Sequence, residues 1–149
     1  MSSMSFPRIK KPTDEVRETN YNYQHFVFTT KYRNKVFNDA ETIKVAREAF
    51  YLEAIDYGME IKVLSFGDDF AHIHMEVNVP TTMTVADAVQ KLKGFAAHEL
   101  LKKIPRLRTD YFWGGHFWGR HYDSSSIGRD EKIVQNYITR QDISGQYVK

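Results

Sequence analysis

The stretch Ala71-His72-Ile73-His74-Met75-Glu76-Val77-Asn78-Val79-Pro80 alternates polar and apolar side chains at nearly every step. Its even positions from 72 to 78 are polar, and its odd positions from 73 to 79 are apolar. A period of two predicts a half-buried β-strand whose successive side chains point to opposite faces of a sheet. The imidazoles of His72 and His74 are therefore expected on one polar face, where together they can ligate a single metal ion.

Strand and helix patterns alternate along the rest of the chain. Strands are expected near residues 21–31, 60–66 and 71–80, with strand material and a tight turn over 111–123. Helices are expected from Asn38 or Asp39 to about 57, from Thr84 to about 104, and over 131–141. The order β-α-β-β-α-β, followed by a helix, predicts an α+β, ferredoxin-like (RRM-like) fold. This fold is an antiparallel sheet with two helices on one face.

Two details refine this expectation. The Gly67-Asp68-Asp69 turn should join the second strand to the histidine strand as an antiparallel hairpin. Gly94, inside the second helix, costs roughly 1 kcal/mol relative to Ala, and close packing or the close approach of a ligand would explain it. Residues 1–18 are expected to be a flexible N-terminal arm, and residues 19–149 a single domain.

Composition limits the class of protein. The chain has 149 residues, a net charge of +2 and no Cys, which excludes disulfides and thiolate zinc sites. No segment predicts a signal peptide or a membrane span, so a cytoplasmic protein that does not bind membranes is expected. Basic residues cluster at 31–35 and at 91–108, as on surfaces that follow phosphates, although solvated helix faces would give the same pattern.

The predicted last helix carries Tyr137 and Gln141, whose i, i+4 spacing places both side chains on one face. Taken alone, Tyr137 would be read as a packing residue, Gln141 as solvated surface, and the histidines as exposed strand residues. Two His completed by an amide oxygen and phosphate oxygens would suit Mg²⁺ or Mn²⁺. Glu76 and Asn78 share the histidine face and could support the metal ligands, although simple exposure on the strand is expected there.

Several motifs, taken in order, resemble a known family. His72-Ile73-His74 resembles the HUH motif (His, hydrophobic residue, His), and Tyr137 with Gln141 resembles the family's catalytic Tyr and helical metal ligand. Further matching segments are Thr30-Lys31-Tyr32-Arg33, Leu92-Lys93-Gly94 and Phe117-Trp118-Gly119-Arg120. Together they are similar to the single-tyrosine HUH transposases, the TnpA proteins of the IS200/IS605 insertion-sequence family. The resemblance covers nearly all of residues 20–142. The polar stretch 121–125 departs from it, since a more apolar strand is expected there.

The resemblance implies a reaction and a set of partners. Mg²⁺ or Mn²⁺ held by His72, His74 and Gln141 would polarise a phosphate of single-stranded DNA, and Tyr137 would attack it to form a 5′-phosphotyrosine. The family implies a homodimer with composite active sites that recognises DNA hairpins. The expected phosphate contacts are Lys31, Arg33, Lys91 and Lys93.

Three other functions share parts of this pattern. One is a non-catalytic single-strand-binding module of ferredoxin-like fold, which would leave the His pair and the pair Tyr137 and Gln141 unexplained. The chain also lacks the Lys/Arg-Gly-Phe-Gly-Phe run that is typical of nucleic-acid-binding sheets of this fold. A domesticated HUH relative that cuts chromosomal repeats fits the sequence equally well. A two-histidine phosphoesterase needs two separated His-x-Ser/Thr motifs, and the chain has none.

Overall fold

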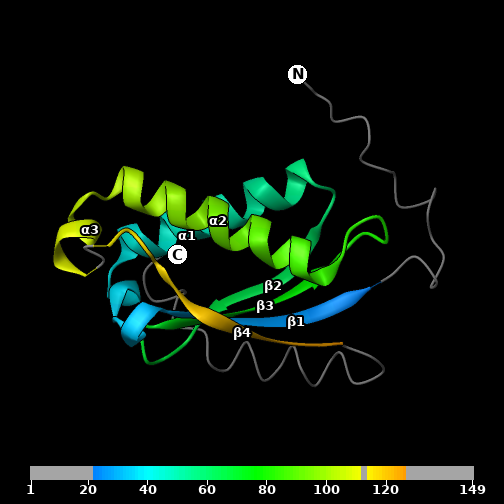
Figure 1. The fold of residues 1–149 in the computed structure, drawn as a ribbon, viewed down its shortest axis with the longest axis horizontal. Helices are drawn as coiled ribbons and strands as arrows, with labels where there is room; N and C mark the ends of the chain where they lie inside the picture. Colours follow the sequence, from blue (N-terminus) through cyan, green and yellow to red (C-terminus); the bar gives the residue numbers. More distant parts are fainter. Residues whose placement is uncertain (1–21, 112–113, 127–149) are drawn as a thin grey trace.

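A four-stranded antiparallel sheet lies beneath two long helices in the computed structural model (Figure 1), which describes residues 22–111 and 114–126. The strands are β1 (Tyr23–Thr30), β2 (Glu60–Phe66), β3 (His72–Asn78) and β4 (Trp118–Ser126). The helices are α1 (Ala40–Asp56), α2 (Val85–Lys103) and the short α3 (Arg106–Asp110), with 3₁₀ turns η3 (Lys31–Arg33) and η4 (Val36–Asn38) after β1.

The sheet order is β2-β3-β1-β4, and every neighbouring pair is antiparallel. This arrangement, with α1 and α2 on one face, confirms the predicted ferredoxin-like α+β fold and the hairpin of β2 and β3. The predicted N-terminal arm and the predicted helix over 131–141 lie outside the described residues. None of the described helices is long and apolar enough to cross a membrane.

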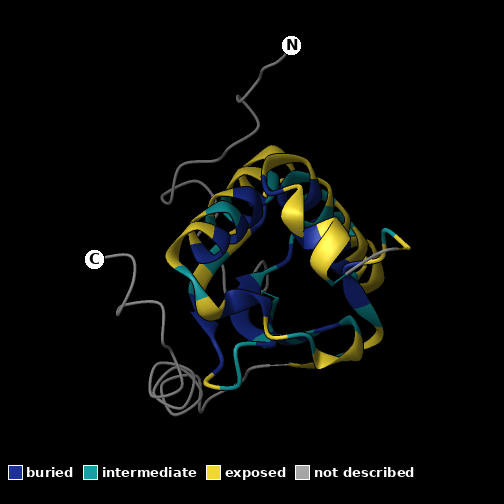
Figure 2. Cartoon of the chain, turned by 90° about the vertical axis from the view of Figure 1, so that its left-hand side faces the viewer, coloured by how far each residue is buried: buried dark blue, intermediate teal, exposed yellow. Residues whose placement is uncertain are grey.

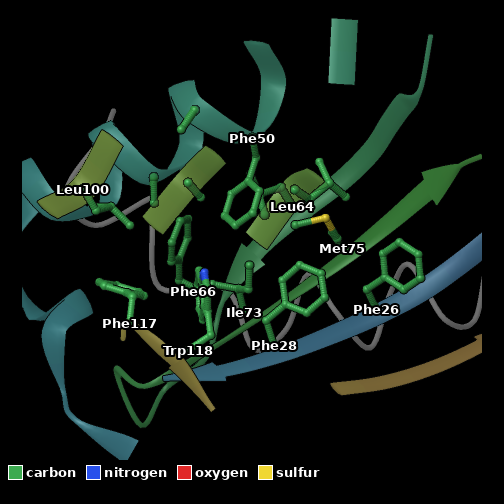
Figure 3. Close-up of a cluster of buried hydrophobic side chains, with 14 of the residues drawn as sticks. Phe26, Phe28, Phe50, Leu64, Phe66, Ile73, Met75, Leu100, Phe117 and Trp118 are labelled. Carbon is green, nitrogen blue, oxygen red and sulfur yellow. The ribbon is translucent and has the colours of Figure 1, made fainter. Parts of the chain in front are cut away.

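The predicted alternation of β3 is confirmed on its apolar side. Ile73, Met75 and Val77 are fully buried against the helices, as are Phe26 and Phe28 of β1. Figure 3 shows Phe26, Phe28, Ile73 and Met75 converging with residues of the helices and of β4 in one core. Buried residues line the inner faces of the helices, and their outer faces are exposed (Figure 2). The opposite face of the sheet is therefore the face that carries the histidines.

Polar side chains cap the N-termini of the two long helices. The Asp39 carboxylate accepts a hydrogen bond from the Thr42 backbone N–H (2.8 Å), so Asp39 rather than Asn38 is the N-cap of α1. Gly58, at φ +73°, follows the helix in a conformation that favours glycine. Thr84 caps α2 by accepting from the Asp87 backbone N–H (3.0 Å). The sequence located both helix starts because these caps are local interactions.

The segment after α2 differs in detail from its prediction. Residues 106–110 form α3, which buries Leu107, and the strand begins only at Trp118. Within the polar stretch 121–125, residues 122–125 nevertheless pair with β1. They do so because Trp118 and Tyr122 face the core and make edge contacts with the Phe28 ring at 5.9 and 6.5 Å. Two aromatic anchors thus hold an otherwise polar edge strand.

Gly94 has no close neighbour among the described residues. A Cβ built at this position meets none of their atoms within 4 Å, so that part of the chain supplies no close packing that would explain the glycine. Gly94→Ala is therefore expected to stabilise the protein by about 1 kcal/mol, the helix-propensity difference between these residues. Chemical denaturation measures this directly, and a destabilised variant would contradict the open environment of residue 94.

Candidate metal centre and its surroundings

The histidine face of the sheet forms an open hollow of about 870 Å³. Its lining comes from three adjacent strands, from η3 and from the β2–β3 turn: His25, Val27, Thr29, Arg33, Asp68, Asp69, His72, His74, Asp123, Ser124 and Ser125. Strand register aligns these positions, since Val27 of β1 lies opposite both His74 of β3 and Asp123 of β4. The hollow is thus a direct product of antiparallel pairing.

His72 and His74 point their Nε2 atoms at a common position. These two atoms are 3.0 Å apart, and the ring planes cross at 79°. Two nitrogens bound at right angles to one ion, each at roughly 2.1 Å, would be about 3 Å apart. The pair therefore fits two adjacent ligand positions of a single divalent cation. Among the described residues, no third His, Cys, Asp or Glu joins them to make a cation-binding group. The predicted ligand Gln141 and the predicted nucleophile Tyr137 lie outside the described residues.

Asp69 orients His72 from the β2–β3 turn. Its Oδ1 lies 2.6 Å from His72 Nδ1 and also accepts the Ala71 backbone N–H at 2.9 Å, while its Oδ2 pairs with Arg33 Nη2 at 2.8 Å. Partial burial works to raise the pKa of Asp69, but the Ala71 hydrogen bond and the His72 and Arg33 contacts outweigh it and lower this pKa. An ionised carboxylate on Nδ1 leaves Nε2 of His72 as the ligating nitrogen. From the sequence, Asp69 was predicted only as a turn residue.

Gly67 makes room for the His72 ring. A Cβ at residue 67 would overlap Cε1, Nε2 and Nδ1 of that imidazole. The Gly67 backbone N–H also donates to the His72 carbonyl at 2.8 Å, which closes the hairpin. The turn residue predicted from the sequence therefore has a second role, because only a glycine allows the ring to lie over the chain here.

Gly67→Ala is accordingly expected to displace the His72 ring and to weaken Mn²⁺ binding by about 10-fold or more, because loss of the groups that orient a metal ligand lowers metal affinity by this factor in other proteins. Isothermal titration of the purified protein with Mn²⁺ measures the effect. Gly94→Ala adds the same methyl group at an open position and should leave the Mn²⁺ affinity unchanged. Equal affinities for the wild type and Gly67→Ala would show that the ring position does not matter.

His25 of β1 is a further imidazole at this site. Its Nε2 lies 3.2 Å from His74 Nδ1, and the two rings are nearly parallel, at 13°, with their centroids 5.4 Å apart. Burial lowers the pKa of His25, and the nearby charge of Asp123 opposes that shift only in part. His25 was not among the site residues predicted from the sequence, where its one signal was its outward position in the strand pattern of β1.

Glu76 does not have the exposure expected from the strand pattern. Glu76 is fully buried on the histidine side of β3. It lies opposite His25 of β1 and Val63 of β2 in the sheet register. Asn78, the next polar position, accepts the Asn22 backbone N–H at 2.8 Å. The prediction of an exposed Glu76 was wrong because alternation gives the face of a strand but not what covers that face.

The four predicted DNA contacts separate into two groups. Lys31 and Arg33 follow β1 beside the hollow, and Arg33 lines it. Lys91 and Lys93 lie on α2, across the sheet from the histidines. The Lys93 ammonium donates to the Gly119 carbonyl at 3.0 Å above the Phe28 ring, and burial lowers its pKa. Lys93 thus ties α2 to β4 in this structure.

Comparisons with known proteins give a consistent result. The family model described as "Transposase IS200 like" matches residues 18–141. The transposases for insertion sequence element IS200 of Salmonella typhimurium and Salmonella typhi are each 27% identical over 117 residues, which is 78% of this chain and 74% of theirs.

Two solved structures share the fold. A protein assigned as a transposase from Deinococcus radiodurans R1 superposes with a TM-score of 0.67 at 24% identity, over 90% of this chain and 98% of that one. A REP-associated tyrosine transposase bound to a REP hairpin gives a TM-score of 0.61 at 14% identity, over 87% and 71% of the two chains.

Proposed function

This chain belongs to the IS200-like transposase family, and from that premise we propose that it cleaves and rejoins single-stranded DNA at insertion-sequence ends through a 5′-phosphotyrosine intermediate. The observation that carries the proposal is the convergence of His72 Nε2 and His74 Nε2, 3.0 Å apart in an open hollow. Mg²⁺ or Mn²⁺ held by these nitrogens and by Gln141 would act as a Lewis acid toward a phosphate oxygen.

The chain's own residues have distinct parts in this reaction. The Tyr137 hydroxyl attacks phosphorus, so that its O–P bond forms as the bond from phosphorus to the 3′-oxygen breaks. The phenol loses a proton and the departing 3′-oxygen gains one, leaving a free 3′-OH. Because the phosphotyrosine retains the energy of the phosphodiester, a second 3′-OH can reverse the step without a nucleotide cofactor. Asp69 keeps the His72 ring in place throughout.

We propose hairpin DNA as the substrate and a homodimer with composite sites as the active form. The REP-associated relative is solved with a REP hairpin, which supports the choice of DNA. The open shape of the hollow is suited to a strand that enters from solvent. A domesticated relative that cuts chromosomal repeats would use the same chemistry and would differ only in the DNA it cuts.

We further propose Lys31, Arg33, Lys91 and Lys93 as phosphate contacts. Lys31→Ala is expected to weaken binding of single-stranded DNA and to make the plot of log affinity against log salt shallower by about 0.7, the value for one released counterion. Fluorescence anisotropy over a salt series measures this slope. Lys44→Ala, at an exposed position of α1, is the control. An unchanged slope for Lys31→Ala or Lys93→Ala would remove that residue from the set.

The function itself is tested by mixing the protein with single-stranded oligonucleotides from the DNA flanking its gene. Incubation with Mn²⁺ or with EDTA, followed by a denaturing gel, separates covalent adducts from free DNA. A slower-migrating adduct is expected only with Mn²⁺. Tight binding without an adduct under either condition would favour a non-catalytic binding module instead.

A further inference from the structure

We propose that His25 is a positioning residue of the metal centre: its Nε2 accepts the proton on His74 Nδ1 and so directs His74 Nε2 at the ion. The inference rests on the proposed metal-dependent function and adds to it a residue outside the HUH motif. It is carried by the 3.2 Å contact between His25 Nε2 and His74 Nδ1 and by the nearly parallel planes of the two rings, which meet at 13°.

The arrangement of protons follows from the partners of each ring. In a ligating histidine, the hydrogen bond made by one ring nitrogen decides which nitrogen binds the metal. His72 Nδ1 donates to the Asp69 carboxylate at 2.6 Å, which leaves a lone pair on its Nε2. His74 Nδ1 has His25 Nε2 as its acceptor, which leaves a lone pair on His74 Nε2 in the same way. The two Nε2 atoms that carry these lone pairs lie 3.0 Å apart, an arrangement that a cation bound to both would stabilise.

Asp69 and His25 therefore have the same role, since each accepts the Nδ1 proton of one of the two ligating histidines, and they do so from opposite sides of the site. Asp69 reaches His72 from the β2–β3 turn, whereas His25 reaches His74 from β1. In the β1–β3 register His74 lies opposite Val27, so His25 is its diagonal neighbour on the same face. A long planar side chain can bridge this diagonal distance. The interplanar angle of 13° shows that the His25 ring lies flat beside His74.

Two substitutions separate the acceptor from the ring. His25→Gln keeps an acceptor oxygen near the position of Nε2 but removes the ring. His25→Phe keeps a flat ring but has no acceptor. If His25 acts by accepting the His74 proton, His25→Phe should weaken Mn²⁺ binding by about 10- to 100-fold, the range for lost orienting partners. His25→Gln should restore the affinity to within a few-fold of the wild type.

The measurement is the dissociation constant for Mn²⁺ by isothermal titration calorimetry on the full chain, with thermal melting of the metal-free proteins as the check on folding. His25→Phe binding Mn²⁺ as tightly as the wild type would overturn the inference and leave the proposed metal centre intact. Equal weakening in both variants would also overturn it, because packing of the ring would then be the cause. A wild type that binds no Mn²⁺ would overturn the metal centre and this inference together.

Discussion

Tyr137→Phe is expected to abolish covalent adduct formation and strand cleavage while leaving DNA affinity nearly unchanged. The substitution removes a single oxygen, and in the proposed reaction that oxygen forms the bond to phosphorus. A free tyrosine has a pKa near 10, so the hydroxyl reacts only where its proton can be removed during the attack. The denaturing gel reports the adduct, and anisotropy with the same oligonucleotide reports binding.

The matched control for this experiment is Tyr32→Phe. Tyr32 follows β1 in the same turn as Arg33, and it is 81% exposed at a positive φ of 60°. It is thus another accessible tyrosine near the hollow, and its loss should leave the adduct unaffected. An adduct that persists in Tyr137→Phe would show that a different nucleophile acts. Loss of DNA binding in Tyr137→Phe would instead make the hydroxyl a recognition group.

The fold was largely predictable because its determinants are local. Alternation along β3 identified the faces of that strand, and Asp39 and Thr84 marked the helix starts through hydrogen bonds within three residues. The segment from Arg106 to Trp118 was less predictable, since α3 depends on burial of Leu107 in a core made by distant residues.

The surroundings of the two histidines could not be predicted in the same way. His25 is 49 residues from His74 in sequence, and only the register of β1 against β3 brings the rings together. Asp69 is close in sequence to His72, but its contact depends on how the hairpin turn folds back. The motif gave the two candidate ligands, whereas the groups that orient them arise from tertiary pairing.

His72→Ala and His74→Ala are each expected to remove metal-dependent cleavage without unfolding the protein. Each variant leaves one imidazole where two converge, so the cation loses one of two protein nitrogens in the described part of the site. Removing a group that stabilises transition-state charge typically costs on the order of 10²–10³-fold in rate, and losing the ion itself costs more. The hydrophobic core lies on the other face of the sheet and is not altered.

Thermal and chemical stability report the loss of the metal independently of DNA. At Mn²⁺ equal to 100 times the wild-type Kd, binding should stabilise the wild type by about 2.7 kcal/mol. A variant whose affinity is 100-fold weaker would gain only about 0.4 kcal/mol at the same concentration. His98→Ala is the control, because His98 is an exposed imidazole on α2, away from the hollow. It should keep the full stabilisation.

The two readouts together decide what the histidines do. Loss of both Mn²⁺ stabilisation and cleavage in His72→Ala would assign the pair to the metal. Lost cleavage with full Mn²⁺ stabilisation would place the ion elsewhere and make the imidazoles contacts to DNA. Full cleavage in both variants would contradict the proposal, because the 3.0 Å pair of nitrogens would then serve only the packing of the sheet face.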